Sequence, residues 1–431
     1  MTRRTTRRRF LGSAVSAGLG AWIWRGSRQT AVAGSANEKL NVGVVGTGGR
    51  GRSNLNGVAR TENIVALCDV DQRRLAKAAE QHPGARQYAD FRRMLEQNNI
   101  DAVVVSTPDH THAPIALAAM ELGKHVYCEK PLAASVSDAR AMAEAAARTG
   151  VVTQMGNQVH ASDHLRKVVE LLQAGVLGRV EKVVTFCHKV LRHSGGELPA
   201  DTPPVPEYLD WNLWLGPVPE RPYHPAYHPG GWRVFWGFGS GNFADMGCHI
   251  LDAPYWGLNL RHPIHIATEG PPPHPHVAPK QLIVRYQFER AEGGTPLEVS
   301  WHDGEAAPAG EIVEGINDGV LIVGERGRLT YNFRGGATQL LPAEAFEGFK
   351  PPEPTLPRPA NHYVEWAEAC KGRGQTASSF QYGAALTEMI MAGVVAYRMG
   401  RPLKWDGPNM QTTDCPEAEA LIRPPRREGW G

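Results

Sequence analysis

The sequence predicts an α/β protein, with an N-terminal Rossmann dinucleotide-binding domain and a C-terminal α+β domain built on a large, mainly antiparallel open sheet. Three observations support this prediction. Short apolar runs alternate with helix-like segments from Leu40, a glycine-rich loop follows the first apolar run, and the texture of the sequence changes after about residue 157. The 431 residues favour two domains, and 42% hydrophobic with 21% charged residues is typical of soluble globular proteins.

The N-terminal domain, residues 37–157, is predicted to contain βαβ units around a parallel sheet. Helix-like segments lie between the apolar runs, and Gly123 and Gly150 stand where two of these helices should end. The candidate strands cover residues 40–45, 64–68, 102–105, 125–128 and 151–155, and the candidate helices cover residues 73–81, 113–122 and 137–148.

Residues 158–431 are predicted to form an α+β domain for substrate binding and oligomerisation. A stretch rich in Pro, Trp, Tyr and His runs from residue 203 to 238, and the histidines at 262, 265, 274 and 276 lie among prolines, which indicates an irregular surface loop. The candidate elements are a helix over 162–173, a strand over 180–186, strands over 282–288 and 297–301, a hairpin over 320–331 turning near Gly327, and a helix over 386–398 that Gly400 and Pro402 end.

Residues 1–36 are predicted to be a signal peptide and linker. Arg7-Arg8-Arg9-Phe10-Leu11 resembles the twin-arginine export signal, an apolar stretch over 11–24 follows, and Ala31-Val32-Ala33 is a candidate cleavage site. A basic tail or a membrane anchor is the alternative, but the apolar stretch is short and rich in Gly and Ser for spanning a membrane. The whole arrangement predicts a periplasmic or otherwise exported protein that uses the twin-arginine machinery as a partner.

Removal of residues 1–33 would change the charge of the chain. These residues hold seven arginines and no acid, which leaves 39 basic and 44 acidic residues and a formal charge of −5. No basic stripe stands out in the remainder, so we expect no nucleic-acid partner. The cysteines at 68, 128, 187, 248, 370 and 415 lack the spacing of a metal site, and we expect no metal.

The glycine-rich loop is the first candidate for cofactor binding. Gly46, Gly48 and Gly51 follow an apolar strand and precede a helix, where glycines permit a tight turn, close approach to a pyrophosphate and close helix packing. A plain glycine-rich turn is the alternative. Asp69 ends the second strand, where an acid would bind the adenosine ribose, so the pair predicts a dinucleotide site that also includes Gly49 and Arg50.

The same acid bears on the choice of dinucleotide. A carboxylate at Asp69 would repel a 2′-phosphate, so NAD is preferred to NADP. The arginines at 50, 52, 73 and 74 keep NADP open as the less favoured cofactor.

Polar residues follow the later strands of the predicted parallel sheet, at the edge where such sheets bind ligands. Residues 106–112 follow one strand, Cys128-Glu129-Lys130-Pro131 ends the next, and residues 154–160 follow the last. The predicted cofactor contacts from these segments are Ser106, Thr107, Pro108, His112, Glu129, Lys130, Asn157 and Gln158.

Two motifs resemble those of the glucose-fructose oxidoreductase, inositol dehydrogenase and rhizopine-catabolism family, called Gfo/Idh/MocA. Residues 129–131 match its Glu-Lys-Pro motif, and residues 245–252 match Asp-x-Gly-x-His-x-x-Asp. The resemblance extends from Leu40 to the C-terminus. It implies a catalytic triad of Lys130, Asp245 and His249 without deciding which member is the base, together with carbohydrate or cyclitol substrates and a homo-oligomer. Asp109 stands where many members carry Asn.

The second motif also has a chemical interpretation of its own. Asp245 and His249 would share one face of a helix, and the glycines over 237–241 would let the backbone fold closely over a ligand. His249 can accept a hydroxyl proton, an acid can orient its ring, and Lys130 can stabilise a developing alkoxide. The alternatives are a structural His–Asp pair, or a metal site that includes Asp252. The glycine loop and Lys130 favour catalysis.

Aromatic residues directly precede this motif. Aromatic rings with polar neighbours suit the apolar face and hydroxyl rim of a sugar, although core packing or a dimer interface explains such residues equally well. The aromatics are Tyr223, Tyr227, Trp232, Trp236 and Phe238, and the predicted substrate contacts are Tyr223, Trp232, Arg233, Asp245 and His249.

Together these features predict an NAD(P)-dependent oxidoreductase acting on CH–OH groups. It would transfer hydride between a secondary alcohol of a sugar, sugar acid or cyclitol and a nicotinamide. Free NAD is scarce outside the cytoplasm, so an exported enzyme should hold its dinucleotide tightly. The alternatives are a redox-neutral, NAD-using glycoside hydrolase or lyase that acts through a transient keto-sugar, and a cofactor-binding protein without catalysis.

Overall fold

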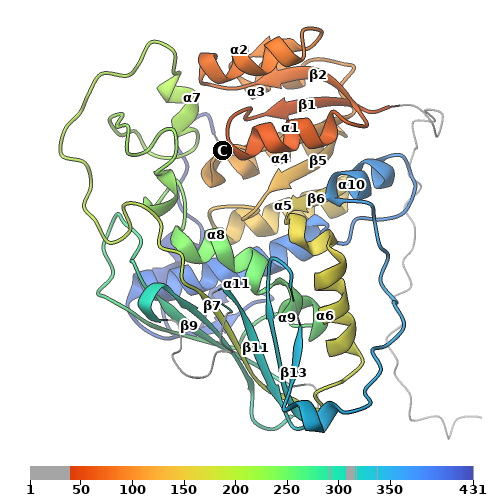
Figure 1. The fold of residues 1–431 in the computed structure, drawn as a ribbon. Coiled ribbons are helices and arrows are strands. Elements are labelled where there is room, and N and C mark those ends of the chain that lie inside the picture. The colour runs from red at the N-terminus through yellow and green to blue at the C-terminus, as the bar shows by residue number, and fades with distance from the viewer. Residues whose placement is uncertain (1–38, 291–292, 307–315, 317, 337, 431) are drawn as a thin grey trace, which may run out of the picture. The chain divides into compact units, whose positions relative to one another are not determined.

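A parallel sheet of six strands forms the N-terminal part of the computed structural model (Figure 1). The strand order β3-β2-β1-β4-β5-β6 reverses beside β1, which is where open α/β sheets bind ligands. The predicted apolar runs form its central strands, because side chains in a parallel sheet are buried on both faces. The strands are β1 (Asn41–Val45), β2 (Asn63–Cys68), β3 (Arg86–Tyr88), β4 (Ala102–Val105), β5 (His125–Glu129) and β6 (Thr153–Gly156).

The structure describes residues 39–290, 293–306, 316, 318–336 and 338–430. The predicted export segment over residues 1–36 lies outside them.

Helices cover both faces of the parallel sheet. The first two pack on one face and the next three on the other. Asp71 and Ser135 accept backbone hydrogen bonds at the starts of the second and fifth helices, and Gly150 ends the fifth in the left-handed conformation, as predicted. The helices are α1 (Arg50–Val58), α2 (Gln72–Gln81), α3 (Phe91–Leu95), α4 (His112–Glu121) and α5 (Val136–Thr149).

A second sheet of nine strands forms the base of the C-terminal part, in the order β13-β12-β11-β7-β10-β9-β8-β14-β15. Within this second sheet, only the β7–β10 pair is parallel among the described strands, so the predicted fold class is confirmed. The strands are β7 (Val180–Cys187), β8 (His265–Glu269), β9 (Ile283–Phe288), β10 (Leu297–Asp303), β11 (Asp318–Gly324), β12 (Gly327–Asn332), β13 (Gln339–Leu341), β14 (Leu403–Asp406) and β15 (Gln411–Thr412).

Helix α11 (Phe380–Met399) joins the two sheets. It packs against α5 on one side and against β8 on the other, and every residue from Leu386 to Tyr397 is buried. Arg140 on α5 and Glu388 on α11 form an ion pair at 2.5 Å. This helix therefore fixes the parallel sheet relative to the second sheet, and both sheets share one hydrophobic core.

Three later segments return to the Rossmann part. Helix α10 (His362–Cys370) packs on α1, where the Tyr363 hydroxyl donates to Asn54 Oδ1 at 2.9 Å. The stretch over 203–238 pairs Leu209 with Asp71 in an antiparallel bridge, and the Trp430 ring lies 6.1 Å from the Phe91 ring. Segments distant in sequence therefore border the edge of the parallel sheet.

The remaining described helices complete the C-terminal part. They are α6 (Asp163–Gln173), α7 (Trp211–Leu215), α8 (Gly241–Ile250), α9 (Asp252–Gly257) and α12 (Glu419–Ile422). The 3-10 turn η1 (Asp109–Thr111) lies between β4 and α4 in the Rossmann part, and the later ones are η2 (Gln158–Ala161), η3 (Trp232–Val234), η4 (Gly304–Ala306), η5 (Ala343–Phe346) and η6 (Pro416–Ala418). Within the described ranges, none of the helices combines the length and the apolar character needed to cross a membrane.

Two expectations about these elements are corrected. The helix predicted over 386–398 begins at Phe380, because Gly383 lets it approach β6 so closely that a Cβ there would lie 2.9 Å from Met155 Cβ. The histidine-rich region over 262–276, expected to be irregular, includes strand β8. Pairing with β9 outweighs the local proline content.

A buried ion pair gives a test of this packing. Arg166 on α6 is fully buried and donates to Glu365 on α10 at 2.8 Å. Glu365→Ala should lower the free energy of unfolding by about 3 kcal/mol, because it leaves a buried guanidinium without its carboxylate. Glu121→Ala, which breaks the exposed pair with Arg148, should leave it nearly unchanged, because water and salt screen exposed ion pairs. Urea unfolding measures both, and equal effects would contradict the assigned packing.

Candidate active site

The glycine loop between β1 and α1 forms a cradle that only glycine can build. Gly46 has φ +84°, and a Cβ at Gly51 would lie 1.9 Å from the Gly46 carbonyl oxygen. Gly49 has φ +52° with open space beside it, and no side chain caps the first turn of α1. The uncapped helix start favours a phosphate, so these residues fit a dinucleotide.

Asp69 braces the cradle. Its Oδ2 accepts from the Thr47 amide at 2.8 Å and from the Thr47 hydroxyl at 3.0 Å, and its Oδ1 accepts from the Asp71 amide at 2.9 Å. Burial raises the pKa of this carboxyl. A carboxylate has about four lone-pair positions, so one remains for a ribose hydroxyl.

A cleft of about 1190 Å³ extends from this cradle across to helix α8. That volume exceeds what a drug-sized ligand needs, and it has room for a dinucleotide together with a second molecule. The buried Thr107 hydroxyl has no hydrogen-bond partner within the described chain and lies in the cleft wall. The predicted site residues that line the cleft are Gly46, Gly48, Gly49, Arg50, Asp69, Ser106, Thr107, Pro108, His112, Glu129, Lys130, Gln158, Trp232, Arg233, Asp245 and His249.

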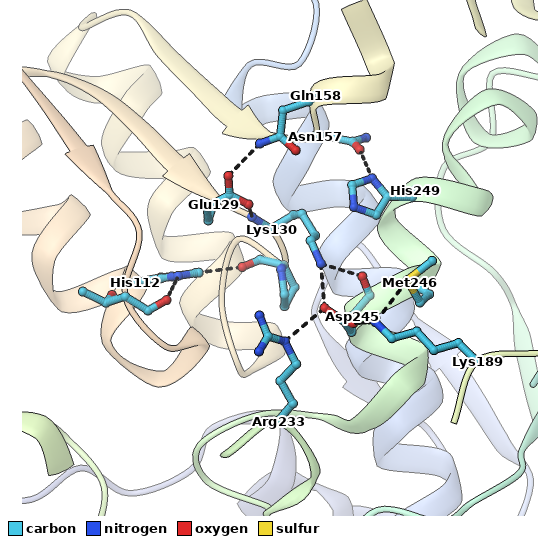
Figure 2. A network of polar contacts seen from close by, with 12 residues as sticks. His112, Glu129, Lys130, Asn157, Gln158, Lys189, Arg233, Asp245, Met246 and His249 are labelled. Carbon is cyan, nitrogen blue, oxygen red and sulfur yellow. Dashed lines mark hydrogen bonds and ion pairs between the residues drawn. The ribbon is translucent and has the colours of Figure 1, made fainter. Parts of the chain in front are cut away.

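Asp245 on α8 lies at the centre of a charged cluster (Figure 2). Its Oδ1 lies 2.8 Å from Lys130 Nζ and 3.1 Å from Arg233 Nε, and its Oδ2 lies 2.6 Å from Lys189 Nζ. Burial disfavours the charged carboxylate, but the three cations outweigh burial and hold the pKa of Asp245 well below its usual value. Asp245 is therefore ionised and is a weak base.

His249 is oriented by Asn157 and not by Asp245. Asn157 Nδ2 donates to Asp252 Oδ2 at 2.8 Å and to the Cys248 carbonyl oxygen at 3.0 Å. Its Oδ1 therefore faces His249 Nδ1 at 2.8 Å, which assigns the proton to Nδ1 and leaves Nε2 unprotonated. Burial, followed by the charge of Lys130, lowers the pKa of His249 well below its usual value.

A second buried network holds the strand ends in place. Glu129 Oε1 accepts from Asn54 Nδ2 at 2.9 Å and from Gln158 Nε2 at 2.6 Å, and burial raises the pKa of Glu129. Both ring nitrogens of His112 lie 2.9 Å from carbonyl oxygens, those of Thr107 and Pro131. His112 therefore ties the loop after β4 to the loop after β5, beside Lys130.

Three predictions for this site are corrected. Asn157 does not line the cleft, because it is fully buried against Asp252 and positions His249 instead. Tyr223 also lies outside the lining, with its ring edge-on to Trp211 at 5.3 Å. The glycines over 237–241 do not line the cleft and were wrongly expected to fold over a ligand. They allow close packing of the chain on itself, since a Cβ at Gly239 would lie 2.6 Å from the Arg233 carbonyl oxygen.

The roles of two site residues were missed by sequence reasoning. Lys189 follows β7 and belongs to no motif, so only the fold brings it to Asp245. Asp252 was considered only as a metal ligand, yet it anchors Asn157 and accepts from Tyr382 Oη at 2.5 Å. Among the residues that the structure describes, no three His, Cys, Asp or Glu side chains gather as ligands for a metal ion.

Family models match most of the chain. Residues 40–157 match the model described as oxidoreductase family, NAD-binding Rossmann fold, and residues 160–431 match that described as oxidoreductase family, C-terminal alpha/beta domain. Both models belong to the Gfo/Idh/MocA group.

Individual relatives match over shorter lengths. An inositol 2-dehydrogenase from Rubrobacter xylanophilus is 36% identical over 146 residues, which is 33% of this chain and 42% of that protein. A glycosyl hydrolase family 109 protein from Solibacter usitatus is 38% identical over 152 residues, which is 31% of this chain and 35% of that protein. The matches thus span less than half the length of these relatives.

A solved structure is similar over most of its length. It is the WlbA dehydrogenase from Bordetella pertussis, in complex with NADH and UDP-GlcNAcA. The match covers 86% of this chain and 99% of the WlbA chain, with a TM-score of 0.63 and 18% sequence identity. At that identity the similarity shows the fold alone.

Asp109 gives a test of the cleft's electrostatics that needs no substrate. Burial raises the pKa of Asp109 to about 8, although Arg233 and Lys130 oppose the shift. The folded chain then binds this proton more tightly than the unfolded chain, so the stability that it contributes is lost as pH rises from about 4 to about 8. Relative to Asp109→Asn, the wild type should lose about 1 kcal/mol per pH unit across that window.

Urea unfolding of both proteins between pH 4 and 9 measures this difference. Parallel stability curves would show that Asp109 is ionised in the folded protein.

Proposed function

This chain belongs to the Gfo/Idh/MocA oxidoreductase family, and on that premise we propose that it oxidises a secondary alcohol of a sugar, sugar acid or cyclitol with NAD. The observation that carries the proposal is the position of His249, Lys130 and Asp245 in the same cleft as the glycine cradle. Bound NAD would accept a hydride at its nicotinamide ring. The cofactor would be held by the glycine loop, Asp69, and the strand-end residues that line the cleft.

His249 is the base in this proposal. Its Nε2 is unprotonated because the ring proton lies on Nδ1, which donates a hydrogen bond to Asn157 Oδ1. The lowered pKa keeps the ring neutral at physiological pH, so it can accept the substrate hydroxyl proton. Asp245 is excluded as the base, since three cations already share its charge.

Lys130 supports the developing alkoxide. Its ammonium donates to the Asp245 carboxylate at 2.8 Å and to the Asp245 carbonyl oxygen at 2.6 Å. These two acceptors hold the ammonium at the cleft wall, with a third N–H left for the substrate oxygen. Asp245 is thus a positioning residue for the lysine.

A redox-neutral glycoside hydrolase or lyase is the second candidate. The similarity to the glycosyl hydrolase family 109 protein favours it. The same base and lysine would serve both reactions, because each begins with removal of a hydroxyl proton. NADH accumulation from free sugars supports the dehydrogenase, whereas release of p-nitrophenol from p-nitrophenyl glycosides without net NADH supports the second candidate.

Variants of the proposed base and lysine test the site. His249→Ala and Lys130→Ala should each lower kcat about 100-fold or more, because general-base catalysis and stabilisation of a developing alkoxide each contribute that much. Asn157→Ala should have a smaller effect, since it loosens the ring without removing it. Initial rates of NADH formation at 340 nm measure all three.

His276→Ala is the matched control. This histidine is exposed on the loop before β9 and lies outside the cleft, so its loss should leave the rate unchanged. Full activity in both His249→Ala and Lys130→Ala would show that the site is wrongly assigned.

We further propose export by the twin-arginine route, to the periplasm, with the dinucleotide bound. The N-terminal arginine pair and the apolar stretch behind it support this route. Tight binding is supported by Trp214 and Trp430, which come from segments outside the Rossmann strands and add walls to the cleft. The six cysteine thiols are free, which suits folding in a reducing compartment before export.

The purified protein should therefore carry its nucleotide. After desalting, we expect close to one NAD or NADH per chain. Trp430→Ala should retain less, because it opens one wall beside Phe91. Chromatography of the nucleotide released by acid measures the content, and an empty wild-type protein would contradict tight binding.

A further inference from the structure

The cluster around Asp245 carries more positive than negative charge. One carboxylate contacts three cations, those of Lys130, Lys189 and Arg233. Arg192 and Arg334 add two further guanidinium groups to the lining of the same cleft. These cations are unbalanced unless other acids lie close by.

The neighbouring acids compensate only in part. Glu129 directs its Oε1 toward the amides of Asn54 and Gln158. Asp109 is mostly uncharged at neutral pH, because burial raises its pKa to about 8. Excess positive charge that is partly removed from water attracts an anion. The cleft wall opposite the glycine cradle is therefore electropositive.

Arg233 has the geometry of an anion clamp. Its Nε is held by Asp245 at 3.1 Å, and its Cζ lies 4.3 Å from the centre of the Trp232 ring. Within the described chain its two Nη atoms form no hydrogen bond, and Figure 2 shows them turned away from Asp245. A planar fork held on two sides with both Nη groups free can bind a carboxylate or phosphate through two parallel hydrogen bonds.

Lys189 supplies a second donor beside the fork. Its ammonium contacts the other oxygen of Asp245 at 2.6 Å, and the side chain is 41% exposed. One of its three N–H groups donates to Asp245 and a second contacts Met246 Sδ at 3.8 Å, so the third is available to a ligand. Arg233 and Lys189 thus flank the same carboxylate and present unused donors to the cleft.

The cofactor does not account for this charge. Its phosphates belong at the glycine loop and the start of α1, where Arg50 and Arg74 line the cleft. An oxidised nicotinamide ring is itself positively charged and would increase the excess near Lys130. A neutral sugar or cyclitol would leave the excess uncompensated.

We propose that the substrate is an anionic sugar, carrying a carboxylate or phosphate group that Arg233 and Lys189 bind. This proposal rests on the proposed function, since it names the substrate class of the same site. The anionic group then anchors the ring at one end of the cleft, while the hydroxyl to be oxidised lies toward His249 and Lys130.

Matched substrates test the proposal, in the gluco, galacto and manno series. Each hexose is compared with its uronate and its 6-phosphate, which differ from it only at C6. We expect kcat/KM at least tenfold higher for one of the two anions than for the neutral hexose. The two anion arms identify which group the site binds.

Variants of the clamp are compared by this preference and not by rate alone. Arg233→Gln should reduce the preference for the anion at least tenfold, and Arg233→Lys, which keeps the charge without the fork, should lie between it and the wild type. Arg148→Gln removes a distant surface charge and should retain the full preference. Equal losses for anionic and neutral sugars in Arg233→Gln would overturn the proposal.

A binding measurement separates this proposal from the proposed function. The uronate or 6-phosphate should raise the Tm of NADH-loaded protein more than the hexose does, and added salt should weaken the effect. Binding of the anion without NADH formation by any sugar would sink the proposed function alone. Turnover or binding that favours the neutral hexoses would sink the anionic substrate alone.

Discussion

The ion pairs of the Asp245 carboxylate organise the rest of the site. The carboxylate lies on a buried helix and holds Lys130 from the parallel sheet, Arg233 from the aromatic stretch and Lys189 from the second sheet. Three parts of the chain are thus tied to one group whose charge is stabilised by all of them. Because loss of the carboxylate would leave three partly buried cations without their shared counter-charge, the arrangement specifies the relative positions of these parts.

Helix α8 fixes the distance between the Asp245 carboxylate, which holds the cations, and the His249 ring, which would accept the proton. Asp245 and His249 lie one turn apart, so the lysine and the imidazole reach the cleft side by side. Asp252, just beyond the helix, works through Asn157 to set the histidine tautomer. Asp245 therefore holds the Lys130 ammonium, and Asp252 orients the His249 imidazole through Asn157.

Sequence patterns predicted the two kinds of sheet and the glycine cradle, because each depends on local geometry or periodicity. The proposed catalytic set of Lys130, Asp245 and His249 was implied by the resemblance to the family's two motifs. Sequence patterns did not reveal Lys189 or the role of Asn157, since these arise from contacts between distant segments. Tyr223 was predicted to contact the substrate but packs against Trp211. An aromatic residue next to a motif packs into the interior as readily as it faces a ligand. The packing of α10 on α1 was also not predicted, because the two helices lie far apart in the sequence.

The proposed mechanism requires His249 to be a neutral base whose Nε2 is unprotonated, because its Nδ1–H donates a hydrogen bond to Asn157 Oδ1. The most direct measurement is ¹⁵N NMR of histidine-labelled protein at pH 7, with the His249 resonances identified by their loss in His249→Ala. We expect a neutral imidazole protonated at Nδ1. An imidazolium signal, or a ring protonated at Nε2, would contradict it.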